Sequence, residues 1–208
     1  TETLTFFDVA ADQHGHIQID TAAQDEFGYL GVVELTGTFA PAVAPQPSIF
    51  VDFGDSADQT DGDWNNVTSL SGSVTDAVNS LGEITEVDVV IIQPFGGHQV
   101  GVESNDAGFP GSAQRDNFYI YYTGTAAVQF EDLAPTAIYD LTVFGSRAAG
   151  SPRVLSVTVN GETLELETAF NESDVLTFRN LSSDANGDLL VQFTGGSSGY
   201  GYLSALQL

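Results

Sequence analysis

One acidic loop holds the densest group of oxygen ligands in the chain. Within VDFGDSADQTDGDWNN, five aspartates follow one another at intervals of two or three residues: Asp52, Asp55, Asp58, Asp61 and Asp63. Ca²⁺ takes about six to eight oxygen ligands and favours carboxylates among them. The glycine and closing glutamate of an EF-hand are out of place here, and a solvated acidic loop is the alternative interpretation. The loop predicts a calcium site formed by these side chains, and we expect no other cofactor.

The same loop ends in the only tryptophan of the chain, which two asparagines follow. A sugar site needs an aromatic ring for the apolar face of a pyranose and planar hydrogen-bonding groups for its edges. The residues that could form such a site are Trp64, Asn65, Asn66, Arg147 and Tyr200. The alternative is a core tryptophan beneath the loop, because tryptophan side chains are mostly buried.

A serine in this region raises the question of catalysis. The stretch Phe53-Gly54-Asp55-Ser56 resembles the first block of GDSL/SGNH esterases, in which the serine is the nucleophile. That mechanism also needs a histidine late in the chain to take the proton of the hydroxyl. The three histidines are His14, His16 and His98, so none follows position 98. We therefore expect no catalytic residues and no enzymatic activity.

The charge balance excludes several classes of partner. Asp and Glu number 29 against four basic residues, all of them arginine, and the formal net charge is −25. Nucleic acid phosphates and anionic membrane surfaces could not be neutralised by such a chain. The chain has no cysteine, and no apolar stretch approaches the roughly 20 residues that span a bilayer. With Thr1 first and no methionine, we expect an extracellular or cell-surface protein whose signal peptide has been removed.

The pattern along the chain predicts an all-β fold of the sandwich or barrel type, because alternating apolar and polar runs are interrupted by turn residues about every eight to twelve positions. Asn160-Gly161 predicts a tight hairpin, since both residues tolerate positive φ. Tyr139 fits a tyrosine corner, in which the hydroxyl returns to the upstream backbone. Only residues 75–81 suggest a helical turn. The expected strands are 48–53, 87–92, 118–122, 127–130, 138–144, 152–159, 162–167, 175–178, 189–193 and 202–208.

An internal repeat connects the two ends of the chain. At a constant offset, with one inserted residue, the N-terminal segment matches the last strands. We expect residues 1–35 to be a partial copy of residues 176–208, residues 36–47 to be a Pro/Ala linker, and residues 48–208 to be one complete module. The matching positions are Leu4-Thr5-Phe6 with Leu176-Thr177-Phe178, Asp12 with Asp184, Gly15 with Gly187, Ile17 with Leu189, Ile19 with Val191, Phe27-Gly28-Tyr29-Leu30 with Tyr200-Gly201-Tyr202-Leu203, and Leu35 with Leu208.

Three short strands cannot bury an apolar face by themselves. Residues 1–35 are therefore either the stub of a preceding module or a segment that pairs with a sheet of its own module or of a neighbouring one. Both interpretations stay open at the level of the sequence.

Residues 48–208 resemble galactose-binding-domain-like β-sandwich modules, which are similar to carbohydrate-binding modules and occur in secreted multi-modular proteins of environmental bacteria. The stretches that carry the resemblance are SIFVDFG, GDWNNVT, AGFPGSAQRDNFYI, FEDLAPTAIYDLTVFGSR, VTVNGETLEL, SSDANGDLLVQF and SGYGYLSALQL. The resemblance implies a jelly-roll-type sandwich, with glycan sites in loops or on a concave face. It brings no catalytic residues, and a fold does not determine a function.

Two functions from different classes follow. The first is a non-catalytic structural or adhesive module of an extracellular array or fibre, whose partners are copies of itself or neighbouring modules. The second is a glycan-binding accessory module of a larger carbohydrate-active protein, whose partner is a polysaccharide. The repeat favours the first, and the tryptophan loop favours the second. We expect neither nucleic acid binding nor membrane insertion in either case.

Overall fold

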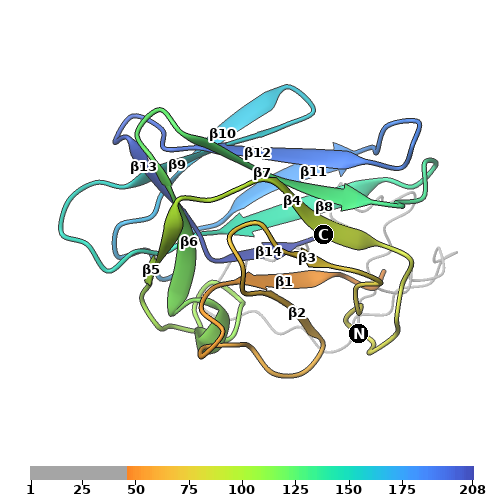
Figure 1. The fold of residues 1–208 in the computed structure, drawn as a ribbon, viewed down its shortest axis with the longest axis horizontal. Helices are drawn as coiled ribbons and strands as arrows, with labels where there is room; N and C mark the ends of the chain where they lie inside the picture. The colour runs from red at the N-terminus through yellow and green to blue at the C-terminus, as the bar shows by residue number, and fades with distance from the viewer. Residues whose placement is uncertain (1–45) are drawn as a thin grey trace, which may run out of the picture. The chain divides into compact units, whose positions relative to one another are not determined.

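A computed structural model describes residues 46–208, which lie within one compact unit (Figure 1). The predicted repeat at residues 1–35 and the linker up to residue 45 lie outside the described residues. The described part is all-β, with one short 3₁₀ helix, η1 (Gly111–Ala113). No helix in this part is long and apolar enough to cross a membrane. The predicted fold class, a jelly-roll-type β-sandwich, is confirmed for the described residues.

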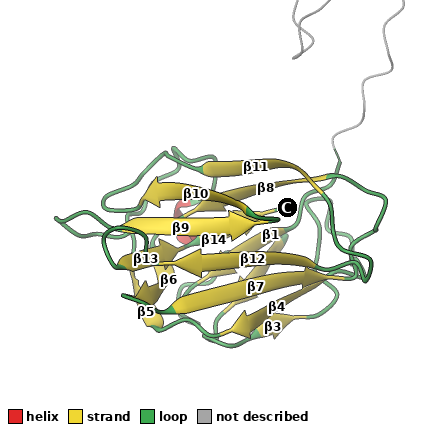
Figure 2. Ribbon diagram, turned by 90° about the horizontal axis from the view of Figure 1, so that it is seen from above, coloured by secondary structure: helices red, strands yellow, loops and turns green. Residues whose placement is uncertain are grey.

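Two large sheets form the sandwich, and Figure 2 looks onto the six-stranded one. This sheet has the order β10-β9-β12-β7-β4-β3, and every pair in it is antiparallel. Its strands are β3 (Ser73–Val74), β4 (Asp88–Gln93), β7 (Thr125–Glu131), β9 (Val154–Val159), β10 (Glu162–Glu167) and β12 (Leu189–Thr194).

The second large sheet has five strands in the order β11-β8-β14-β1-β2, with the last strand of the chain at its centre. Strands β1 and β2 run parallel, and the other pairs are antiparallel. The amide of Ile49 donates to the carbonyl of Leu208 at 2.8 Å, so the first and last strands of the described unit lie side by side. The strands are β1 (Phe50–Phe53), β2 (Trp64–Val67), β8 (Tyr139–Phe144), β11 (Leu176–Leu181) and β14 (Ala205–Gln207).

A third, three-stranded sheet with the order β13-β6-β5 lies at one end of the sandwich (Figures 1 and 2). Both of its pairs are antiparallel. Its strands are β5 (Gly97–Val100), β6 (Asp116–Tyr121) and β13 (Tyr200–Leu203). This sheet carries the side chains of the site described below.

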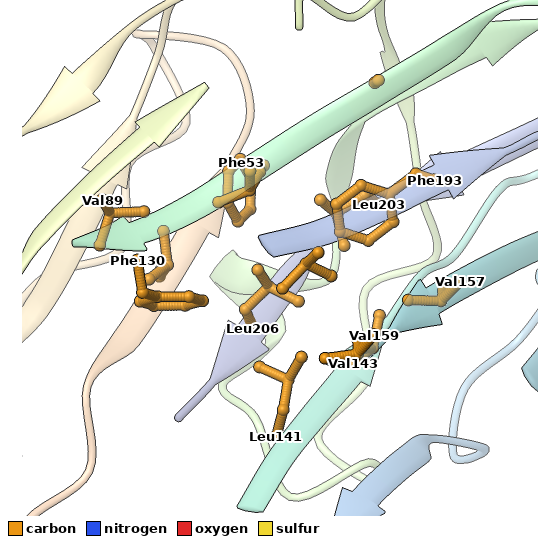
Figure 3. Close-up of a cluster of buried hydrophobic side chains, with 14 of the residues drawn as sticks. Phe53, Val89, Phe130, Leu141, Val143, Val157, Val159, Phe193, Leu203 and Leu206 are labelled. Atoms are coloured by element: carbon orange, nitrogen blue, oxygen red, sulfur yellow. The ribbon is translucent and has the colours of Figure 1, made fainter. Parts of the chain in front are cut away.

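The core consists of the inward-facing residues of the strands. These residues alternate with outward-facing ones along each strand, because successive side chains point to opposite faces of a sheet. Figure 3 shows Phe53, Phe130, Phe193 and Leu206 gathered in one cluster, and all four are completely buried. Truncating a buried Phe to Ala in such a core costs about 3–5 kcal/mol. Four apolar positions that the sequence repeat shares are core positions in the described copy: Phe178, Leu189, Val191 and Leu203 are all buried. Two others, Leu176 and Leu208, are partly buried and pack against the core.

The structure confirms the predicted hairpin and tyrosine corner, but not the predicted helical turn. Asn160 and Gly161 have φ of 48° and 85° between β9 and β10, as the hairpin prediction requires. The hydroxyl of Tyr139 donates to the carbonyl of Ala134 at 3.4 Å, which confirms the tyrosine corner. The helical turn expected at residues 75–81 is wrong. Asp76 has a φ of 54°, and Val78 forms an isolated antiparallel bridge with Ile84 instead.

Candidate functional site

Four tyrosines form a ladder on one face of the β13–β6 pair. Tyr200 lies opposite Tyr121 and Tyr202 lies opposite Tyr119, and residues two apart on a strand share a face. The ring centroids of Tyr119 and Tyr121 are 4.9 Å apart, those of Tyr121 and Tyr200 are 5.9 Å apart, and those of Tyr119 and Tyr202 are 6.1 Å apart. These separations are typical of interacting aromatic pairs. We call Tyr119, Tyr121, Tyr200 and Tyr202 the tyrosine ladder.

Two glycines beside β6 leave room for the ladder. Gly97 on β5 lies opposite Tyr119 in the sheet. A Cβ atom on Gly97 would be 2.6 Å from the hydroxyl oxygen of Tyr119, and one on Gly96 would be 3.2 Å from its ring. A side chain at either position would push the ring away. The glycines therefore allow the ring of Tyr119 to lie over the neighbouring strand.

The ladder runs from a buried end to an exposed one. Tyr202 is 5% exposed, whereas Tyr121 is 52% exposed. Tyr122, directly after β6, has a φ of 33° and is 67% exposed, and its ring centroid lies 5.1 Å from that of Tyr200. Large exposed aromatic groups on a soluble domain are typical of binding surfaces. The exposed end of the ladder is therefore an aromatic surface open to a ligand.

Two of the four arginines of the chain border the ladder. The guanidinium carbon of Arg153 lies 5.2 Å from the ring centroid of Tyr200, and that of Arg147 lies 5.8 Å from the ring centroid of Tyr202. Both distances are within the range of cation–π contacts. Nη1 of Arg147 also donates to the carbonyl of Val100 at 2.8 Å, which fixes this side chain beside β5. The arginines add planar hydrogen-bond donors at the border of the aromatic surface.

The surroundings of two ladder phenols, Tyr119 and Tyr200, raise the pKa of each. The hydroxyl of Tyr119 lies 3.2 Å from that of Tyr121, and this hydrogen bond, together with partial burial, raises the pKa of Tyr119 to about 12. Loss of hydration and the nearby Tyr122 raise the pKa of Tyr200 above its usual value. A tyrosine hydroxyl can both donate and accept a hydrogen bond, so each exposed hydroxyl can engage a polar ligand.

The structure brings Arg147 and Tyr200 of the predicted glycan site to the ladder, and places Trp64 in a small apolar cluster. The indole of Trp64 stacks on Phe50, with ring centroids 5.1 Å apart, and meets the edge of Phe109 at 6.0 Å. It is half-buried, on the edge strand β2. These contacts favour the core interpretation that the sequence left open for Trp64.

The amide side chains beside Trp64 satisfy backbone groups. Nδ2 of Asn65 donates to the carbonyls of Phe50 and Val78, at 2.9 and 2.8 Å, and its Oδ1 accepts from the amide of Val78 at 2.9 Å. Asn66 exchanges hydrogen bonds with the backbone of Thr60, accepting at 2.8 Å and donating at 2.9 Å. Both asparagines thus connect strand β2 to neighbouring backbone segments, and their side-chain polar groups already have hydrogen-bond partners.

The five aspartates of the acidic loop do not converge on one point. Asp52, on β1, is 2% exposed, and its Oδ2 accepts from the amide of Thr60 at 3.1 Å. Burial, together with the charge of Asp116, raises the pKa of Asp52 to about 7. Asp61 and Asp63 are exposed, and Asp63 lies near Gly82. Among residues 46–208, no group of three or more His, Cys, Asp or Glu side chains is arranged to hold a metal ion.

Asp116, at the start of β6, is a buried carboxyl that sequence reasoning missed. It is 4% exposed, its Oδ2 accepts from the amide of Asp55 at 2.6 Å, and burial raises its pKa to about 6. Nothing in RDNFYI distinguishes this aspartate from the many solvated ones. Only the pairing of β6 with β5, and its approach to the loop after β1, show that it is buried.

A pocket of about 260 Å³ opens beside Asp116, and its other lining residues are Asp55, Asp58, His98, Gln99 and Val100. Nδ1 of His98 lies 3.0 Å from Oδ2 of Asp55. Nη2 of Arg115 lies 3.0 Å from Oδ1 of Asp58. The outer carboxylates of this pocket therefore each have a basic partner.

The esterase-like serine is not set up as a nucleophile. Oγ of Ser56 lies 3.5 Å from Oδ1 of Asp55, and His98 contacts the other oxygen of the same carboxylate. The group next to the hydroxyl is thus a carboxylate, whereas the serine mechanism needs an imidazole there. His14 and His16 lie outside the described residues.

A larger and more open pocket, of about 500 Å³, has a mostly acidic lining that includes Asp76, Glu86, Asp88 and Asp132. Oδ1 of Asp88 accepts from the amide of Asp76 at 2.9 Å. In the described part of the chain, no buried polar atom without a partner belongs to these lining residues. The chemistry of this pocket is that of a solvated acidic surface.

No protein-family model matches the chain, and no curated protein matches it. Among solved structures, it is similar to a CBM35 from Cellvibrio japonicus Abf62 (21% identity, 57% of this chain and 91% of that one, TM-score 0.35) and to a family 35 carbohydrate-binding module from Clostridium thermocellum (14%, 57% and 95%, 0.34). It is also similar to an exo-β-1,3-galactanase from Phanerochaete chrysosporium (15%, 68% and 30%, 0.34). Carbohydrate-binding modules are thus among the similar structures.

Proposed function

We propose that this chain is a non-catalytic glycan-binding module and that the exposed end of the tyrosine ladder is its contact surface. The observation that carries the proposal is the pairing of Tyr121 with Tyr200 across two strands, with the ring of Tyr121 exposed and Arg153 against the ring of Tyr200. The other function expected from the sequence, a structural or adhesive module, depends on residues 1–35. These residues lie outside the described part, so self-association stays a prediction.

The chemistry of the ladder suits a sugar ring. The apolar face of a pyranose packs on an aromatic face, and its hydroxyls need donors and acceptors at the ring edge. Tyr121 and Tyr122 offer ring surface together with a hydroxyl each, and Arg153 offers planar donors. The strands hold Tyr121 and Tyr200 in place, so little side-chain entropy is lost on binding.

The nearby glycines and the hydrogen bond between Tyr119 and Tyr121 fix the arrangement before a ligand arrives. A preorganised surface keeps more of its contact energy as affinity. We expect a polysaccharide to be recognised through one or two sugar units at the exposed end, since Tyr202 is buried at the other end.

Affinity gel electrophoresis with a panel of plant, algal and microbial polysaccharides tests this function. The native chain should be retarded by at least one of them, and Tyr121→Ala and Tyr200→Ala should each lose most of that retardation. Ile84→Ala is the matched control, because Ile84 is 77% exposed and lies between β3 and β4. Retardation by no polysaccharide, or equal retardation of the native chain and the tyrosine variants, would contradict the proposal.

A further inference from the structure

Phe170, in the turn after β10, is an exposed aromatic residue in a backbone conformation that suits other residue types better. It has a φ of 50° and is 58% exposed. A positive φ is an outlier for a bulky residue, and Gly or Asn adopts it at lower cost. A polar side chain would also suit the solvent better. Neither the backbone nor the surroundings explain a phenylalanine here, so the exposed ring itself points to a function.

Two buried polar residues hold the turn that carries this ring. Thr168 is completely buried, and its amide and its hydroxyl both donate to the carbonyl of Arg153, each at 2.6 Å. Asn171 is also buried, and its Nδ2 donates to the carbonyl of Gly145 at 2.9 Å. Phe170 lies between these two anchors. The backbone that presents the ring is therefore fixed before a ligand arrives, which lowers the entropy cost of binding.

The same turn is bonded to the two arginines that border the tyrosine ladder. The amide of Phe170 donates to the carbonyl of Arg147 at 2.8 Å, and the guanidinium carbon of Arg147 lies 5.8 Å from the ring centroid of Tyr202. Arg153, whose carbonyl fixes the first anchor, places its guanidinium carbon 5.2 Å from the ring centroid of Tyr200. Each arginine thus contacts the ladder through its side chain and the turn of Phe170 through its backbone.

We propose that Phe170 is a second aromatic contact for the glycan, so that the module recognises an extended chain of several sugar units. This inference rests on the proposed function of the ladder. One or two units lie at the exposed end of the ladder, and further units pass the arginines and reach Phe170. The ring of Phe170 offers an aromatic face to the apolar face of a pyranose. The guanidinium groups donate to hydroxyls of the units between the two contacts.

A second contact makes affinity depend on the length of the ligand. When both contacts bind one chain, the second adds to the affinity without a second cost of association. A stacked aromatic ring then corresponds to a gain of about five- to tenfold in affinity. A hexasaccharide should therefore bind about five- to tenfold more tightly than a disaccharide of the same sugars, because only the longer ligand reaches Phe170.

Calorimetric titration of the 1–208 chain with a disaccharide and a hexasaccharide from the polysaccharide that retards it tests this contact. Phe170→Gly removes the ring and suits the positive φ, so its Tm should equal or exceed that of the native chain. It should bind the disaccharide with native affinity and lose the gain for the hexasaccharide. Ile138→Ala is the matched control and should bind both ligands like the native chain, because Ile138 is 62% exposed and precedes β8, whereas Arg147 follows it.

Three results would overturn Phe170 as a second contact. They are native hexasaccharide affinity in Phe170→Gly, equal affinity of the native chain for both ligands, and an equal loss of both ligands in Phe170→Gly. Tyr121→Ala separates these results from a failure of the proposed function. If it loses both ligands, the ladder stands and the inference about Phe170 alone fails. If the native chain binds neither ligand, both proposals fail.

Discussion

Tyr121 and Tyr200 face each other across β6 and β13, with ring centroids 5.9 Å apart, and Arg153 lies against the ring of Tyr200. Neither tyrosine is required to fill the core of the sandwich. Exposed aromatic rings that are held in place by strand pairing and not by burial are suited to binding a ligand. This relationship is the basis of the proposed glycan contact.

The two parts of Tyr121 contribute differently to that contact. Tyr121→Phe keeps the ring and removes one hydroxyl, so we expect a loss of affinity of a few-fold, because one hydrogen bond contributes about 1 kcal/mol. Tyr121→Ala removes both parts and should lose about tenfold or more. Calorimetric titration with an oligosaccharide from the polysaccharide that retards the native chain measures both losses of affinity. A larger loss for Tyr121→Phe than for Tyr121→Ala would be incompatible with a stacking role.

Gly97→Ala tests the support of the ladder from the neighbouring strand. The added methyl would lie 2.6 Å from the hydroxyl oxygen of Tyr119 and should displace that ring. We expect a several-fold drop in glycan affinity with a loss of stability of about 1 kcal/mol. Gly150→Ala is the matched control, because a Cβ there meets no atom within 4 Å. Full glycan affinity in Gly97→Ala would show that Tyr119 does not position the ladder.

Trp64 should matter for stability and not for glycan binding. Its indole is half-buried between Phe50 and Phe109, so Trp64→Ala should lower the free energy of unfolding by about 2–4 kcal/mol. Trp64→Phe keeps part of the packing and should bind the glycan with native affinity. Denaturant unfolding and affinity electrophoresis separate the two effects. Lost retardation of a folded Trp64→Phe would restore Trp64 as a sugar contact.

The chain should become less stable as the pH rises from 5 to 7.5. The folded-state pKa of Asp52, about 7, and that of Asp116, about 6, both exceed the ordinary value of 3.8. In this window the folded state therefore binds more protons than the unfolded state, and stability is lost as the carboxyls ionise. Asp55, Asp58 and Arg115 also face the pair.

The expected loss over this pH window is on the order of 2–4 kcal/mol, since one pKa unit corresponds to about 1.4 kcal/mol. Thermal unfolding at a series of pH values measures this loss. Asp52→Asn should flatten the profile, and Asp61→Asn should leave it as in the native chain. If stability fell equally steeply with pH in the native chain and in Asp52→Asn, the pH dependence could not be assigned to Asp52.

Much of the fold could be predicted from the alternation of apolar and polar residues. Ten expected strands correspond to observed ones, and 202–208 contains parts of two, β13 and β14. Strands β2, β3 and β5 were missed, because WNNV, SV and GHQV are short and carry few apolar residues. Such strands form where their neighbours provide a partner, and their own sequence does not reveal that partner.

The site was harder to predict than the fold. The spacing of Tyr119 with Tyr121, and of Tyr200 with Tyr202, already places each pair on one face of a strand. The pairing of β6 with β13 is a long-range register, so the ladder appears only in the folded chain. Asp116 became recognisable only through its burial, since its local sequence resembles that of a solvated aspartate.

An NMR titration of the ¹⁵N-labelled chain with an oligosaccharide from the polysaccharide that retards it tests most directly whether the tyrosine ladder is the glycan contact surface. The proposed function predicts that the largest shifts of backbone amide signals fall on β6, from Tyr119 to Tyr122, and on β13, from Tyr200 to Tyr202. The opposite result would be large shifts around Trp64, with unchanged signals on β6 and β13. That outcome would place the glycan on β2 and contradict the tyrosine ladder as the binding surface.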